Sequence, residues 1–157
     1  MDTLIAYYSF SGRTHYEAKR MAEKTGGELY EVREQKRRSL LSALVFGVSQ
    51  ARKRKHVYVE PFAVNMEEYG RVIIMCPVWG GYPAPAFNSI VAELVRGQEV
   101  QIVLTSDSGK AHDTDELKKR VELQGVRVTE ISVIKTEDLK KRDRMHEKRM
   151  REQTEEE

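Results

Sequence analysis

The sequence predicts an α/β protein with a doubly wound parallel sheet of five strands and helices on both faces. Two observations lead to this prediction. Apolar runs bounded by turn signals alternate along the chain with segments of helical periodicity. Three of these runs, around residues 4–8, 72–76 and 100–104, are almost continuously apolar. Strands have this composition when both faces of a parallel sheet are covered.

The five strands are expected at residues 4–8, 28–32, 71–76, 100–105 and 126–134. The run at 28–32 is the weakest of them. The last run is interrupted by Arg127, Thr129 and Glu130, which suits a more exposed strand at the edge of the sheet.

Three helices are expected between the strands, at residues 14–25, 85–96 and 114–124. Thr14 and Glu17 have the spacing of a capping box, which would start the first helix. Pro85 suits the first position of the second helix. Gly26 and Gly125 follow the first and third helices, and glycine commonly ends a helix.

A further helix is expected at residues 39–48, between two basic clusters. Its predicted inner face carries Leu40, Leu41, Leu44, Val45 and Val48. Between Glu31 and Val59 the chain has eight basic and two acidic residues, a net charge of about +6. A positive surface favours an acidic partner, an anionic substrate or anionic lipid, although a solvated charged face is the simpler alternative. Nucleic acid is disfavoured, because the sequence holds no recognition motif.

The length of 157 residues fits one domain, expected at 1–135, followed by a charged helix at 136–157 with a frayed end. No apolar run approaches the roughly 20 residues of a membrane span. The single cysteine, Cys76, lies in an apolar run, so we expect a small buried side chain and a reducing, cytoplasmic environment. The four histidines lack metal-ligand spacing, and no metal is expected.

An anion site is predicted where the first strand meets the first helix. Ser9, Ser11 and Thr14 supply hydroxyl groups, and Gly12 lets the backbone pass close to a ligand. The first N–H groups of the helix have no partner inside it and point into this turn. The sequence has neither a Walker A loop nor a G-x-G-x-x-G fingerprint. An ordinary strand–helix turn is the alternative.

Two other loops should converge with this turn, because ligands of such sheets bind beyond the carboxyl ends of the strands. The loop at 77–86 holds Trp79 and Tyr82 among glycines and prolines. A large ring in a tight loop suits contact with a flat ligand; the alternative is packing of Trp79 on the helix at 85–96. The loop at 105–113 offers hydroxyl groups and Gly109 but no aromatic residue. Its His112 is either a proton donor or a solvent-exposed side chain.

The first loop resembles the phosphate loop of the flavodoxin family, [ST]-x-[ST]-G-x-T, and the second resembles the P-x-W-G-x-x-P-A-P-A of many small flavodoxin-like proteins. The matching residues are Ser9, Ser11, Gly12 and Thr14, then Pro77, Trp79, Gly80, Pro83, Ala84, Pro85 and Ala86. The resemblance implies a flavodoxin-like sheet of order 2-1-3-4-5 and an FMN cofactor. It implies FMN contacts at Ser9, Phe10, Ser11, Gly12, Arg13, Thr14, Pro77, Val78, Trp79, Gly80, Gly81, Tyr82, Ser106, Asp107, Ser108 and Gly109.

Two functions are compatible with this resemblance, and neither assigns a catalytic residue. The first is electron transfer between a reductase and a redox partner protein, by a carrier that is a monomer or a homodimer. The small size of the chain favours it. The second is an FMN-dependent NAD(P)H oxidoreductase of the quinone-reductase type. The third loop favours it, because without a stacking aromatic one face of the flavin would be open to a substrate.

Overall fold

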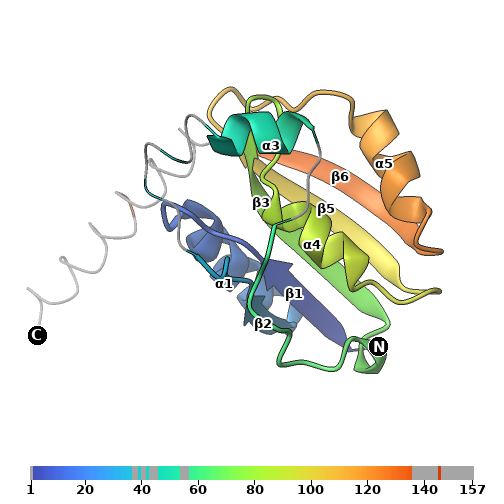
Figure 1. The fold of residues 1–157 in the computed structure, drawn as a ribbon. Helices are drawn as coiled ribbons and strands as arrows, with labels where there is room; N and C mark the ends of the chain where they lie inside the picture. Colours follow the sequence, from blue (N-terminus) through green and yellow to red (C-terminus); the bar gives the residue numbers. More distant parts are fainter. Residues whose placement is uncertain are drawn as a thin grey trace, which may run out of the picture.

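The computed structural model describes residues 2–36, 39, 42, 46–53, 57–135 and 145. Within them a parallel sheet lies between two layers of helices (Figure 1). The elements in chain order are β1 (Thr3–Tyr7), α1 (Arg13–Thr25), β2 (Glu28–Glu31), α3 (Val48–Arg52), a 3-10 turn (Met66–Glu68), β3 (Arg71–Trp79), β4 (Tyr82–Pro83), α4 (Ala86–Ala92), β5 (Glu99–Ser106), α5 (Thr114–Glu122) and β6 (Arg127–Lys135).

The sheet confirms the predicted strand order. Its strands run β2-β1-β3-β5-β6 and are all parallel, which is the order 2-1-3-4-5 once the short β4 is set aside. The two-residue β4 was not predicted. It pairs antiparallel with the end of β3, Trp79 opposite Tyr82, and so extends β3 to Trp79, beyond the predicted end at Cys76.

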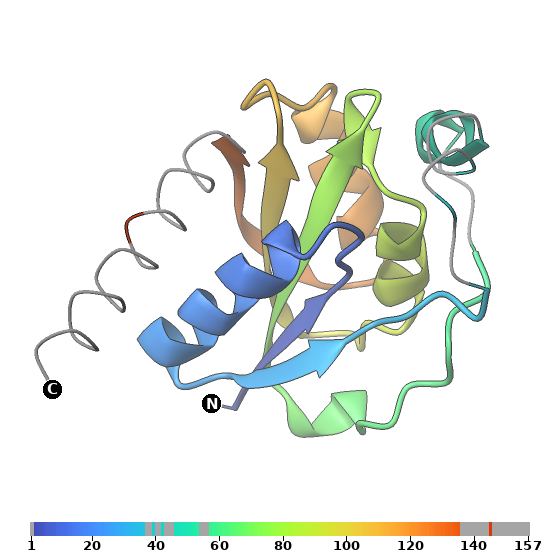
Figure 2. The same cartoon turned by 90° about the vertical axis from the view of Figure 1, so that its left-hand side faces the viewer.

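Alternate residues of each central strand feed two separate cores. Leu4 and Val72 join the cluster under α4 and α5, which contains Phe87. Ile5 and Ile73 join a smaller cluster that packs on α1. Figure 2 shows α1 on one face of the sheet and α4 with α5 on the other. Because both faces are covered, the strands must be apolar at successive positions, which explains the continuous apolar runs.

The capping box predicted at Thr14 and Glu17 is wrong. The helix begins one residue earlier, at Arg13, and its cap is Gly12 in the left-handed region (φ +93°), with no side-chain capping bond. The Thr14 hydroxyl instead lies 3.0 Å from the Thr105 hydroxyl of β5. A tertiary contact has therefore displaced the local cap that the spacing suggested.

The helix predicted at 39–48 falls mostly outside the described residues, as do Leu40, Leu41, Leu44 and Val45. The described part of this region forms α3, which buries Ala51 and half-buries Val48. The predicted C-terminal helix at 136–157 also lies outside the described residues, apart from Met145. No helix in the part of the chain that the structure describes is long and apolar enough to cross a membrane.

Candidate functional site

The turn between β1 and α1 forms a small cradle of donors. The backbone N–H of Gly12 donates to Ser9 Oγ over 3.1 Å, which closes the turn. The N–H of Tyr16 makes the first intrahelical bond, to the Gly12 carbonyl. The helix donors before it, at residues 13–15, are those that an α-helix leaves unpaired. A Cβ on Gly12 would meet no atom within 4 Å, so there is open space beside these donors.

The third loop is fastened to this cradle at two points. Thr14 Oγ1 and Thr105 Oγ1 lie 3.0 Å apart, and both side chains are buried. The Arg13 guanidinium lies 3.5 Å from an Asp107 carboxylate oxygen, and the Asp107 side chain is 91% exposed. An ion pair that exposed contributes little to stability, so Arg13 is free to turn toward another anion.

The second loop turns through Gly80 and Gly81, both at positive φ (+59° and +91°). This two-residue hairpin conformation needs positive φ at both positions, which glycine adopts without strain. The turn is also crowded from two sides. A Cβ on Gly80 would lie 2.5 Å from Val48 of α3, and one on Gly81 would lie 2.8 Å from the ring of His112.

The second and third loops are joined through His112 and Asp113. The His112 N–H donates to the Gly81 carbonyl over 2.7 Å, and Tyr82 donates its hydroxyl proton to Asp113 over 3.2 Å. The ring of His112 also meets the ring of Tyr82 edge to face, with centroids 5.6 Å apart. His112 therefore links the two loops, and its side chain is solvent-exposed, as one of the two alternatives expected from the sequence had it.

Trp79 packs on the first loop. Its ring meets Tyr8 and Phe10 edge to face, with centroids 6.0 and 5.8 Å away. The Tyr8 hydroxyl in turn donates to Glu34 over 2.5 Å. Trp79 is half-buried and also packs against the larger core cluster, which includes Phe87 of α4. Its contact with a flat ligand stays a prediction.

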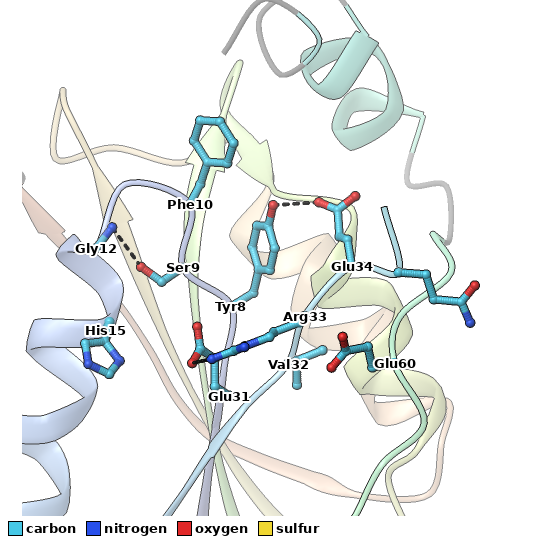
Figure 3. A pocket seen from close by; sticks show the side chains of 11 residues that line it. Tyr8, Ser9, Phe10, Gly12, His15, Glu31, Val32, Arg33, Glu34 and Glu60 are labelled. Carbon is cyan, nitrogen blue, oxygen red and sulfur yellow. Dashed lines mark hydrogen bonds and ion pairs between the residues drawn. The ribbon is translucent and has the colours of Figure 1, made fainter. Parts of the chain in front are cut away.

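A cavity of about 670 Å³ adjoins the cradle (Figure 3). It is lined by Tyr8, Ser9, Phe10 and Gly12, by His15 of α1, by residues 31–35 and by Glu60. Sequence reasoning missed most of this wall. Residues 31–35 follow β2 and reach the same edge of the sheet as the other loops, so the rule for parallel sheets could have indicated them. Glu60 follows an isolated bridge between Glu34 and Val59 that no local pattern foretells.

Comparison with solved structures gives the fold. A flavoprotein from Lactobacillus acidophilus, solved in complex with FMN, is 23% identical with a TM-score of 0.70, over 84% of this chain and 92% of that one. A putative flavoprotein from Bacteroides eggerthii is 20% identical with a TM-score of 0.72, over 88% and 93%. A flavodoxin from Megasphaera elsdenii is 15% identical with a TM-score of 0.50, over 83% and 84%. The chain has a flavodoxin-like fold. No family model and no curated protein sequence matches it.

The flavodoxin-like arrangement brings the three predicted loops to the carboxyl edge of the sheet. Loop one contacts loop two through Phe10 and Trp79, and contacts loop three through Thr14 and Thr105. The wall of the cavity includes only some of the predicted site residues of the three loops. Ser9, Phe10 and Gly12 line it, whereas the predicted residues at 77–82 and 106–109 lie outside its wall. The cavity reaches the first loop at Ser9 and Gly12, beside the helix donors on which the predicted anion site depends.

Tyr7 and Cys76 are among the titratable groups near this edge that have perturbed pKa values. Burial raises the pKa of the Tyr7 phenol, the nearby Glu31 raises it further, and Arg33 lowers it. The Tyr7 hydroxyl shares a hydrogen bond of 2.5 Å with Nδ1 of His15, a residue of the cavity wall. Burial also raises the pKa of the Cys76 thiol. Cys76 is fully buried, as the sequence predicted, and its protonated thiol is a poor nucleophile.

The described residues contain no group of three or more His, Cys, Asp or Glu side chains that would hold a metal ion. Two of the three carboxylates that line the cavity in the described part of the chain have other partners. Glu31 pairs with Arg33 at 3.0 Å, and Glu34 accepts the Tyr8 hydroxyl. The chemistry that this edge offers is binding through backbone N–H groups, hydroxyl groups and aromatic rings.

Proposed function

We propose that this chain binds FMN and carries electrons between a reductase and a redox partner protein. The observation that supports this most strongly is the cradle at Ser9 and Gly12, held against two glycine- and hydroxyl-containing loops at one edge of a flavodoxin-like sheet. The Lactobacillus acidophilus flavoprotein, which has a similar fold and was solved in complex with FMN, agrees with it. The prediction of a cytoplasmic location, which rests on the single cysteine, belongs to the same proposal.

The residues of the cradle fit a terminal phosphate. The open space beside Gly12 leaves room for it, and the positive end of the α1 dipole favours a dianion there. Ser9 and Ser11 would add hydroxyl donors, and Arg13 would leave its exposed partner Asp107 to meet the new charge. The Thr14 hydroxyl already has a buried partner, so its main part would be to hold the helix start in place.

The other two loops would place the flavin ring, which supplies the redox chemistry when FMN is bound. Trp79 and Phe10 present aromatic surface beside the cradle. The turn at Gly80 and Gly81 and the backbone at residues 106–109 would offer N–H and carbonyl groups to the ring edge. The bonds from His112 and Tyr82 keep these two loops in register with each other.

A quinone-reductase type of activity with NAD(P)H is the second candidate. It is favoured by the third loop, where residues 105–111 include no aromatic side chain that would cover a flavin face. A carrier leaves its flavin edge accessible to a protein, whereas a reductase needs space for two small substrates in turn.

Two assays test the proposal, and the second separates the two candidates. The first is retention of FMN by the purified chain after desalting, followed by visible absorbance, which tests cofactor binding itself. The second compares steady-state turnover of NAD(P)H and a quinone with reduction of the same protein by a ferredoxin-type reductase. The carrier proposal expects reduction by the reductase and negligible quinone turnover. Rapid quinone turnover with NAD(P)H as sole donor contradicts it.

A further inference from the structure

The short helix α3 packs one face against the carboxyl edge of the sheet, where the flavin is proposed to bind, and exposes the other face to solvent. Its inner face is Val48 and Ala51, spaced as one side of a helix, with Ala51 1% exposed. Val48 lies so close to Gly80 that a Cβ there would be 2.5 Å from the valine methyl. α3 contacts β4 and the end of β3 beside this turn, and Figure 1 shows it at that end of the sheet. The helix is therefore part of the rim around the proposed flavin site.

The outer face of α3 combines positive charge with an exposed aromatic ring. Arg52 and Lys53 are exposed, and Phe46, just before the helix, is 62% exposed. Aromatic residues and arginine are enriched in protein interfaces.

The charge is distributed unevenly along the sequence. Residues 35–59 hold seven of the 27 Lys and Arg residues and none of the 25 Asp and Glu residues. The remaining residues therefore carry 20 basic and 25 acidic side chains, a net charge of −5. A polarised charge distribution orients a partner as it approaches, because the positive region attracts an acidic surface while the rest of the molecule repels it.

We infer that the outer face of α3 docks an acidic patch on a protein redox partner, an inference that rests on the proposed electron-transfer function. The contact with Gly80 places such a partner at the flavin-binding edge. A protein with a compact acidic patch fits these observations better than a membrane or a nucleic acid. Either of those presents an extended negative surface, which the acidic remainder of this chain would repel.

A charge-reversal pair tests the docking face without using the flavin. The test variant combines Arg52→Glu with Lys53→Glu and reverses the charge at α3. The control variant combines Lys24→Glu with Arg96→Glu and makes the same change in net charge. Both control residues are exposed and lie at the opposite, amino-terminal edge of the sheet. The probe is fluorescein-labelled poly-L-glutamate, followed by anisotropy at low salt. The α3 pair should weaken binding by about tenfold or more and the control pair by less than about twofold, and about 0.15 M salt should weaken the wild-type complex.

Equal weakening by both pairs would show that net charge and not α3 attracts the acidic probe, and would overturn the inference. Tighter binding of vesicles rich in phosphatidylserine, or of a single-stranded oligonucleotide, than of poly-L-glutamate at the same salt concentration would overturn it as well. These readouts need no FMN. Failure of the docking inference is therefore separable from failure of FMN binding, which a flavin titration of the same variants reports.

A redox readout then locates the docking face relative to the flavin. The reduced FMN form is mixed with hexacyanoferrate(III), an anion, or with hexaammineruthenium(III), a cation. Each ion accepts one electron, so two ions oxidise one fully reduced flavin. The rate of oxidation by the anion should fall when salt is added and in the α3 pair. The rate of oxidation by the cation should rise under the same two changes. Rates with both ions that do not differ between the α3 pair and the wild type would contradict a docking face at the flavin edge.

Discussion

Thr14 Oγ1 at the start of α1 lies 3.0 Å from Thr105 Oγ1 at the end of β5, although 91 residues separate them in the sequence. Both side chains are buried. This one bond ties the cradle to the third loop and sets the distance between two parts of the proposed FMN site.

Replacing either threonine by valine should destabilise the protein, because the remaining hydroxyl is left buried without its partner. The expected loss in the free energy of unfolding is about 1–3 kcal/mol for Thr14→Val or Thr105→Val alone. The double variant should lose less than the sum of the two, by about 0.5 kcal/mol or more. Urea denaturation of all four proteins measures this. Strictly additive losses would show that the two hydroxyl groups do not depend on each other.

The Gly80 turn should be intolerant of a side chain for two separable reasons. The first reason is backbone strain, because alanine at a positive φ costs about 1–2 kcal/mol in the free energy of unfolding. Gly26→Ala should show this strain alone, because a Cβ at Gly26 would meet no atom within 4 Å. Gly80→Ala should cost more than this control, since its Cβ would also meet Val48. Thermal or urea unfolding compares the two variants.

The excess cost of Gly80→Ala should disappear when the methyl groups that cause it are removed. In the background Val48→Ala, the additional change Gly80→Ala should cost no more than Gly26→Ala does in the wild type. If the excess cost persists, Val48 does not cause it. The contact between α3 and the turn would then be contradicted, and with it the place of α3 on the rim of the proposed flavin site.

The pattern of the sequence was sufficient for the sheet because every central strand is buried on both faces. A short, continuous apolar run bounded by turn signals is typical of a buried strand, and the three central strands were predicted in this way. The two edge strands, β2 and β6, gave weaker signals. The loops that follow β1, β3 and β5 could be assigned to one edge for the same reason. Their order needed the family resemblance, because periodicity does not tell which strands are neighbours.

The misses depended on contacts between distant residues. The Thr14 hydroxyl lies beside Thr105 and makes no capping bond, and the ring contacts of Trp79 with Tyr8 and Phe10 of another loop were not predicted. The wall of the cavity depends on the bridge between Glu34 and Val59, which brings Glu60 beside the end of β2. None of these pairings leaves a periodic signal in the sequence.

Trp79 should report FMN binding directly, because it is the only tryptophan of the chain. Its fluorescence should be quenched as FMN is added. Trp79→Ala should weaken FMN binding by about 0.5–1.5 kcal/mol, the range for an aromatic pair, and should lower stability through its lost contacts with Tyr8 and Phe10. Trp79→Phe keeps a ring and is the matched control. Unchanged FMN affinity and an unchanged flavin spectrum in the alanine variant would remove Trp79 from the site.

Tyr69 should be among the last tyrosines to ionise. Its hydroxyl donates to Glu28, and this bond, with burial and the nearby carboxylate charge, raises the pKa of Tyr69 to about 12. The folded-state pKa exceeds the unfolded value, so the contribution to stability is complete below about pH 10 and is lost as the pH rises toward 12.

The change in tyrosinate absorbance with pH measures this, with Tyr69→Phe identifying the signal. Glu28→Gln should move the Tyr69 pKa back toward its ordinary value. The substitution removes the negative charge of Glu28 and weakens the hydrogen bond that the Tyr69 hydroxyl donates to this side chain. A Tyr69 signal that titrates with the exposed tyrosines in the wild type would contradict the Glu28 contact.

The central claim is that the cradle at Ser9 and Gly12 binds the phosphate of FMN, and the most direct measurement is titration of the apo chain with FMN and with riboflavin. Riboflavin has the same ring and ribityl chain but lacks the phosphate. Two charge-assisted hydrogen bonds of about 1.5 kcal/mol each predict FMN affinity at least about 100-fold higher than riboflavin affinity. Flavin fluorescence follows both titrations under the same conditions. Equal affinity for the two flavins would contradict the claim.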